Sequence, residues 1–113
     1  MAKLTYLEIP ASDPPRAARF YEAIVGWTID QRSADDFRFS DDDASMIGRF
    51  QRGTGGAGPV SYFTVADVAV AVARVAPLGG EVIKAPYREG DVLVAQLRDP
   101  SGNVFGVWQF ARA

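Results

Sequence analysis

A turn followed by an apolar run decides the fold: DPSGN at residues 99–103, then VFGVWQF at residues 104–110. Proline fixes its own backbone and biases the preceding residue toward extended geometry, so the Asp-Pro pair opens a turn. The glycine and asparagine that follow tolerate the left-handed backbone that closes it. The run is rich in branched and aromatic residues, which is typical of a buried strand. Because side chains alternate along a strand, we expect apolar residues on both of its faces.

Composition places the chain among ordinary globular domains. It has 113 residues, of which 48% are hydrophobic and 23% are charged. The net charge of −2 and the isoelectric point of about 5.0 argue against a nucleic-acid partner and favour neutral or cationic ligands. The chain begins with MAKL and contains no long apolar run. We therefore expect no signal peptide, no membrane partner and a cytoplasmic protein.

Two residue types are missing, and their absence limits the chemistry. The sequence contains no histidine, which is the commonest general base and the commonest transition-metal ligand. It also contains no cysteine, so disulfides, thiolate ligands and a cysteine nucleophile are excluded. A Ser-His-Asp mechanism is impossible, and a zinc site would have to use oxygen ligands only.

The chain has two matching halves, each with a strand, a helix and about three further strands. In the first half we expect strands at 4–10, from 27–30, within 35–43 and at 44–50, and a helix at 13–26. In the second we expect strands at 60–65, 81–84, 92–97 and 104–110, and a helix at 67–80. The spacing from Asp13 to Gly26 recurs from Asp67 to Gly80 on the other side of a glycine-rich linker at 53–59. Internal duplication explains this symmetry.

Four short segments carry a resemblance to a known family. They are LEIPASDP at 7–14, the helix that ends with Phe20-Tyr21 and Gly26-Trp27, LGG at 78–80 before a strand, and DPSGN at 99–103. In this order and spacing the chain resembles the vicinal oxygen chelate superfamily, which includes glyoxalase I, bleomycin-resistance proteins and extradiol dioxygenases. The resemblance implies an α+β fold of two βαβββ modules, about 1–52 and 60–113, that form one domain over 1–113. It further implies curved mixed sheets around a groove, and a homodimer.

Enzymes of this superfamily hold a divalent metal on the inner sheet faces through His, Gln or Glu. The resemblance carries those positions to Tyr6, Gly48, Val60 or its neighbour Ser61, and Gly106, none of which is a usual ligand. Hard cations accept oxygen ligands, but they need several that converge. On the relevant face we expect only Glu8 and Tyr6 to offer oxygen. We therefore expect no metal ligands and no cofactor.

Without a metal, apolar and aromatic side chains should line the groove, with two glycines leaving space between them. The residues expected to bind a ligand are Tyr6, Glu8, Met46, Gly48, Phe50, Val60, Tyr62, Gly106 and Trp108. Trp108 is the stacking candidate among them. The alternative is that these side chains fill a collapsed core, because apolar residues on a sheet face usually serve packing.

Glu8 stands out because a carboxylate that faces inward on a central strand costs free energy unless it is paired. It could act as a base beside Tyr6 as an acid, or as the counter-ion of a cationic ligand. It could equally form a salt bridge with one of three arginines: Arg49, Arg88 or Arg98. The sequence leaves both interpretations open.

The resemblance and the missing ligands together favour a metal-independent protein that binds an apolar or aromatic small molecule in the groove. We expect a binding protein rather than an enzyme. The alternative is a glyoxalase-like lyase or isomerase, with acid–base chemistry by Glu8 and Tyr6 or with a metal site rebuilt from oxygen ligands. A third interpretation is a module that serves only structure or protein interaction.

Overall fold

The computed structural model describes residues 2–53 and 58–111, and the chain divides into two compact units. The N-terminal unit is Thr5–Val60, and the C-terminal unit is Ser61–Ala113 together with Met1–Leu4. Of the predicted glycine-rich linker, residues 54–57 lie outside the described residues. Within the described part of the chain, no helix has the length and hydropathy needed to span a membrane.

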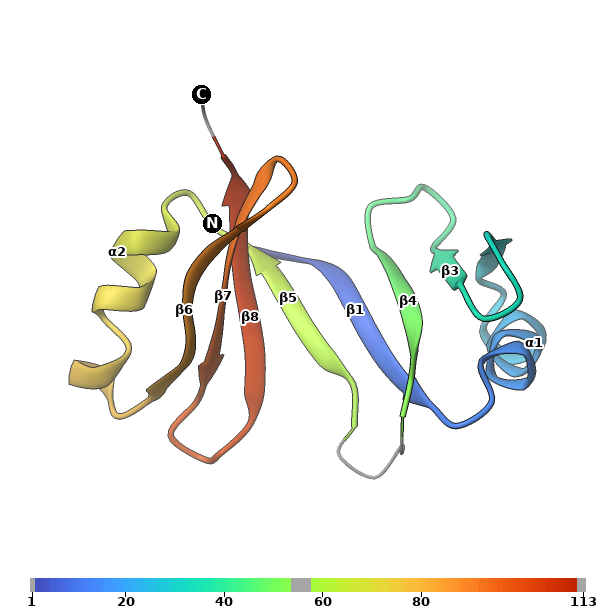
Figure 1. The fold of residues 1–113 in the computed structure, drawn as a ribbon, viewed down its shortest axis with the longest axis horizontal. Coiled ribbons are helices and arrows are strands. Elements are labelled where there is room, and N and C mark those ends of the chain that lie inside the picture. Colours follow the sequence, from blue (N-terminus) through green and yellow to red (C-terminus); the bar gives the residue numbers. More distant parts are fainter. Residues whose placement is uncertain (1, 54–57, 112–113) are drawn as a thin grey trace. The chain divides into compact units, whose positions relative to one another are not determined.

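The N-terminal unit is a βαβββ module with a four-stranded mixed sheet (Figure 1). Its elements are β1 (Lys3–Ala11), α1 (Pro14–Val25), β2 (Thr28–Gln31), β3 (Phe37–Ser40) and β4 (Ile47–Arg52). The strand order is β2-β3-β4-β1; β1 and β4 are parallel and the other neighbours are antiparallel. The order of elements is the one predicted from the sequence.

Local signals set the limits of α1, as predicted. The Asp13 side chain caps the helix by accepting a hydrogen bond from the backbone N–H of Arg16 at 3.2 Å. Pro14 occupies the first helical turn, where its missing N–H costs nothing. Gly26 ends the helix with a φ of 76°, the left-handed conformation that glycine adopts most readily.

Helix α1 covers one face of this sheet, and the core between them is aromatic. Trp27 stacks on Phe39 on one side and on Tyr21 of α1 on the other, with ring centroids 4.3 and 5.1 Å apart. Phe50 of β4 lies in the same core, where only 2% of its surface is exposed. The remaining buried residues of this cluster are Ile9, Ala11, Ala18 and Phe37.

Strand β4 begins later than predicted, at Ile47 instead of residue 44. The residues before it form a turn in which Ala44 has a φ of 57°. The Asp41 carboxylate holds this turn closed by accepting hydrogen bonds from the Ser45 hydroxyl at 3.1 Å and from the Met46 backbone N–H at 3.3 Å. These local hydrogen bonds compete with strand pairing, so Met46 lies outside the strand.

The C-terminal unit repeats the module. Its elements are β5 (Val60–Thr64), α2 (Val68–Ala73), the 3-10 helix η2 (Ala76–Leu78), β6 (Glu81–Glu89), β7 (Val92–Arg98) and β8 (Val104–Phe110). The strand order is β5-β8-β7-β6, with β5 and β8 parallel and the other neighbours antiparallel. Helix α2 packs on one face of this sheet, where its Val68 is buried against Ala95, Leu97 and Val107.

Two predicted boundaries in this unit are wrong. The helix expected over 67–80 is split into α2, which ends at Ala73, and the 3-10 helix η2. Pro77, in the first turn of η2, has no backbone N–H with which to continue the α-helical hydrogen bonds. The strand expected at 81–84 continues to Glu89, so residues 86–89 also belong to β6. The pairing of β6 with β7 is irregular between Val82 and Tyr87, a stretch that contains Pro86 and so lacks one backbone donor.

The turn at 99–103 has the predicted form. The Asp99 carboxylate accepts hydrogen bonds from the backbone N–H groups of Ser101 and Asn103, at 2.8 and 2.9 Å. Gly102 has a φ of 93°. These contacts favour the ionised carboxylate, and those from Asn103 contribute most to lowering the pKa of Asp99 below its ordinary value.

The charge of Asp99 should make stability depend on pH in the acid range. Because the folded pKa is depressed, the ionised form stabilises the fold above the ordinary value of 3.8, and this contribution is lost as pH falls through the folded pKa. Asp99→Asn keeps an acceptor oxygen but cannot titrate. In urea unfolding, the stability advantage of the wild type over Asp99→Asn should shrink between about pH 5 and about pH 2. A difference that stays constant over this range would contradict the assignment.

Gly48 makes room for the aromatic core, and filling that room should destabilise the protein. A Cβ at Gly48 would lie 2.1 Å from the Leu7 carbonyl oxygen and 2.3 Å from the Phe39 ring. We expect Gly48→Ala to lower the free energy of unfolding by about 1–3 kcal/mol, the usual cost of overpacking. Gly53→Ala is the matched control, because the nearest described atom to a Cβ there is the Gln51 carbonyl oxygen at 4.0 Å. Equal denaturation midpoints for the two variants would show that the close packing at Gly48 does not contribute to stability.

Candidate functional site

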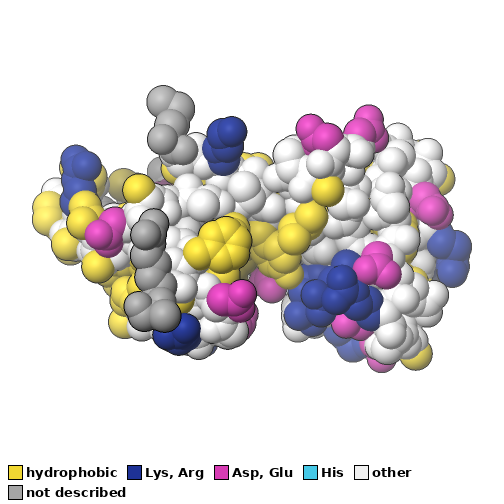
Figure 2. All heavy atoms as spheres, turned by 90° about the horizontal axis from the view of Figure 1, so that it is seen from above, with side chains coloured by type: hydrophobic (Ala, Val, Ile, Leu, Met, Phe, Trp, Pro, Cys, Tyr) yellow, Lys and Arg dark blue, Asp and Glu magenta, His cyan; other side chains and the backbone are white. Residues whose placement is uncertain are grey.

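The face of the N-terminal sheet turned away from α1 carries a row of charged residues. Side chains alternate along β1, and Leu7 and Ile9 pack in the core beneath α1, so Tyr6 and Glu8 lie on the opposite face. The backbone register continues the row across all four strands. We call it the charged row; its members are Glu8, Arg49, Arg38 and Asp30. Figure 2 shows basic and acidic side chains gathered together over this unit.

Arg38 is held by an acidic residue two positions before it. Its Nε and Nη2 donate to the two carboxylate oxygens of Asp36 at 3.2 and 3.3 Å. This hydrogen bonding lowers the pKa of Asp36 and raises that of Arg38, so both groups stay ionised. Asp30 pairs with Arg32, whose Nε lies 3.0 Å from the carboxylate.

Arg49 differs from its neighbours because its Nε is buried and, among the residues that the structure describes, has no hydrogen-bond partner. Glu8 lies directly opposite Arg49 in the register of β1 and β4. Within the described residues, however, no nitrogen of Arg49 comes within 4.0 Å of a carboxylate oxygen.

The other two arginines proposed as partners of Glu8 are engaged elsewhere. Arg98 forms an ion pair with Glu81 across β7 and β6. Arg88 donates from its Nε to the carbonyl oxygen of Gly90 at 3.3 Å. The salt-bridge interpretation of Glu8 is therefore wrong for the part of the chain that the structure describes.

Three residues predicted to line the ligand site face the other way. Gly48 and Phe50 lie on the α1 side of β4, and Met46 packs against the same core. The β4 residues that share a face with Tyr6 and Glu8 are Ile47 and Arg49. The prediction assigned the apolar alternate residues of this segment to the ligand, whereas the core beneath α1 needs them.

The face of the C-terminal sheet turned away from α2 carries the remaining predicted residues. Tyr62 and Gly106 are paired across β5 and β8, and the Tyr62 ring occupies the space of a side chain at Gly106, where a Cβ would lie 2.2 Å from the ring. Val60 and Trp108 share this face by alternation along their strands. The structure brings these four residues onto one face, and ligand binding by them stays a prediction.

Three further side chains on this face were missed by the sequence interpretation. Gln96 donates from its amide to the Tyr62 hydroxyl at 2.9 Å, across the gap left by Gly106. Val94 of β7 is paired with Trp108 of β8 on one side and with Tyr87 of β6 on the other, so the three lie in one row across the sheet. The Lys84 ammonium lies 4.0 Å from the centre of the Tyr87 ring. The strand was expected to end at residue 84, so the position of Tyr87 on the sheet was not predicted. We call Tyr62, Tyr87 and Trp108 the aromatic face.

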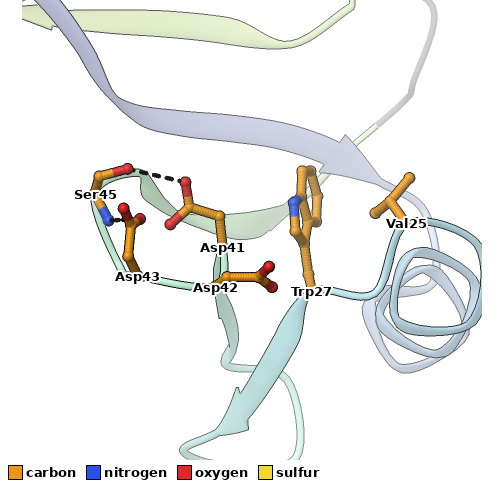
Figure 3. A pocket seen from close by; sticks show the side chains of 6 residues that line it. All are labelled: Val25, Trp27, Asp41, Asp42, Asp43 and Ser45. Atoms are coloured by element: carbon orange, nitrogen blue, oxygen red, sulfur yellow. Dashed lines mark hydrogen bonds between the residues drawn. The ribbon is translucent and has the colours of Figure 1, made fainter.

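A surface pocket lies at the end of α1, beside the turn that precedes β4 (Figure 3). Its lining residues are Val25, Trp27, Asp41, Asp42, Asp43 and Ser45. Ser45 hydrogen-bonds to the carboxylates of both Asp41 and Asp43, and its contacts lower the pKa of Asp43. These carboxylates therefore serve the turn itself.

The donor set does not fit the divalent metal that the superfamily resemblance implies. Among the described residues, no group of three or more His, Cys, Asp or Glu side chains is placed to hold a metal ion. The space at Gly48 and Gly106 is taken by the rings of Phe39 and Tyr62. On the face that carries Glu8, the neighbouring side chain in register is the cation Arg49, which repels a metal ion.

Comparisons with known proteins agree with this fold. The family described as a glyoxalase-like domain matches residues 6–108. A glyoxalase/bleomycin resistance protein/dioxygenase superfamily member from Vibrio splendidus 12B01 aligns with a TM-score of 0.74 at 14% identity, covering 96% of this chain and 99% of that one. Methylmalonyl-CoA epimerase from Mycobacterium tuberculosis aligns with a TM-score of 0.71 at 13% identity, covering 96% and 88%. No curated protein matches the chain. The chain belongs to the glyoxalase-like family of the vicinal oxygen chelate superfamily.

Proposed function

We propose that this chain is a metal-independent small-molecule-binding protein whose ligand is an apolar or aromatic compound, held on the aromatic face. The observation that carries the proposal is the Tyr62 ring over Gly106. At a position where the superfamily resemblance places a metal ligand, the chain has no side chain and an aromatic ring fills the space. Where a metal-binding member of the superfamily would have a ligand atom, this chain therefore presents the apolar surface of the Tyr62 ring.

The geometry of the aromatic face suits a flat ligand. Tyr62 is only 8% exposed, so its ring forms a rigid base of the sheet face. Trp108 and Tyr87 are half-buried in the adjacent row, on either side of Val94. Rings held in this way favour stacked or edge-on contact with another aromatic system, which adds to the free energy of apolar burial.

Polar groups beside the rings can orient such a ligand. The Gln96 amide donates to the Tyr62 hydroxyl, and its carbonyl oxygen accepts no hydrogen bond from the described residues. Lys84 brings a positive charge next to Tyr87. Sites for small molecules commonly combine an apolar lining with a few such polar groups. We infer that a compound with one acceptor or donor at its edge binds better than a pure hydrocarbon.

Acid–base chemistry by Glu8 and Tyr6 is the alternative function. The observation in its favour is that the two side chains share one face and that Glu8 has no ion-pair partner within the described residues. This alternative requires turnover of a substrate, whereas the proposed function requires only saturable binding.

Trp108 allows a direct test, because the chain contains only two tryptophans. In Trp27→Phe the remaining indole reports on the aromatic face alone, so its emission should change during titration with uncharged benzene compounds, which do not emit in the range of tryptophan. Calorimetry should then show that Trp108→Ala weakens binding by about tenfold or more, whereas Trp27→Phe retains the wild-type affinity. The proposal fails if no compound perturbs the emission, or if Trp108→Ala binds as tightly as the wild type.

A further inference from the structure

Arg49 is the exception among the arginines at the strands of the N-terminal unit. Arg32, Arg38 and Arg52 each pair with an aspartate, at 3.0, 3.2 and 2.5 Å. Their side chains are 54%, 39% and 56% exposed, so water already solvates them in part. Arg49 is half-buried with its Nε fully covered, yet it has no carboxylate partner among the described residues. Burial makes an ion-pair partner more important for Arg49 than for the three paired arginines, yet Arg49 is the one that has none among the described residues.

A half-buried guanidinium without a carboxylate partner carries a charge that water solvates only in part, and burying such a charge costs free energy. A guanidinium presents a planar fork of N–H donors that matches two oxygens of a carboxylate or a phosphate. Arg49 as a whole is only half-buried, so a bound oxyanion would meet the accessible part of its side chain and neutralise its charge. Although the whole chain carries a net charge of −2, the centre of this sheet has Arg38 and Arg49 side by side in register.

The residue next to Arg49 on the same face is apolar. Ile47 lies two positions earlier on β4 and is 48% exposed. It is paired with Tyr6 of β1 and with Ser40 of β3. A ligand held by its oxyanion at Arg49 can therefore rest an aliphatic or aromatic part on Ile47.

We propose that Arg49 binds the carboxylate or phosphate group of a small organic anion, with the apolar part of the ligand over Ile47. The groups that face this site are Glu8 on β1, Arg38 on β3 and Asp36, which neutralises Arg38. Glu8 lies opposite Arg49, so its charge opposes the anion and limits affinity. This site lies in a different unit from the aromatic face, and neither proposal rests on the other.

The probes are butyrate for a carboxylate ligand, inorganic phosphate for a phosphate ligand, and butyramide as the uncharged counterpart of butyrate. Calorimetry at constant ionic strength, with sodium chloride as the reference salt, should show saturable binding of butyrate or phosphate and weaker binding of butyramide. The tighter of the two anions identifies the headgroup. Binding should also raise the melting temperature.

Three variants test the role of Arg49. Arg49→Gln should weaken anion binding by about tenfold or more without lowering the melting temperature, because it removes a buried donor that lacks a partner. Arg19→Gln makes the same charge change on the exposed surface of α1 and should bind as the wild type does. Glu8→Gln removes the opposing charge and should tighten binding.

Arg49→Lys keeps the charge without the planar fork, and it serves if Arg49→Gln does not fold; its affinity should also fall below that of the wild type. Three results would overturn the proposal. The first is that the wild type binds neither butyrate nor phosphate. The second is that it binds butyramide as tightly as butyrate. The third is that the Arg49 variants bind the anion as tightly as Arg19→Gln does.

Discussion

In each unit, a helix packs on one face of a four-stranded mixed sheet, and the apolar contact between them fixes the direction of every strand side chain. Phe39, Phe50 and Trp27 fill this contact beneath α1, whereas Leu97, Ala95 and Val107 fill it beneath α2. Because strand residues alternate, the burial of one set leaves the other set on the opposite face. The charged row and the aromatic face are the two sets left over, so the core packing decides which residues are available for function.

Much of the fold could be predicted because its signals are local. The cap at Asp13, the stop at Gly26 and the turn built by Asp99 each depend on hydrogen bonds within a few residues. The boundaries failed where a local structure competed with the regular one, as in the turn closed by Asp41 and in the helix interrupted by Pro77. The sequence gives little warning of these contacts, since aspartate and proline occur both within helices and strands and in the turns beside them.

The candidate site was harder to predict, because its residues meet only across strands. Alternation correctly grouped Tyr62 with its neighbours, but alternation alone cannot say which face of β4 meets the helix. Phe50 was therefore assigned to the ligand instead of the core, and Arg49 was considered only as a partner for Glu8. The space at Gly48 is filled by Phe39, a residue of another strand, which no local pattern reveals. Gln96 and Lys84 were missed for the same reason.

In the described part of the chain, neither sheet face turned away from a helix has three or more carboxylates placed to hold a metal ion, and the N-terminal one carries Arg49 without an ion-pair partner. The most direct test of metal independence is elemental analysis of protein purified without chelator, followed by thermal unfolding in EDTA and in excess Mg²⁺, Mn²⁺, Ni²⁺ or Zn²⁺. Specific binding to the folded state must raise the melting temperature. We predict no stoichiometric metal and the same melting temperature in every condition. A stoichiometric metal whose removal lowers the melting temperature would contradict the proposed function.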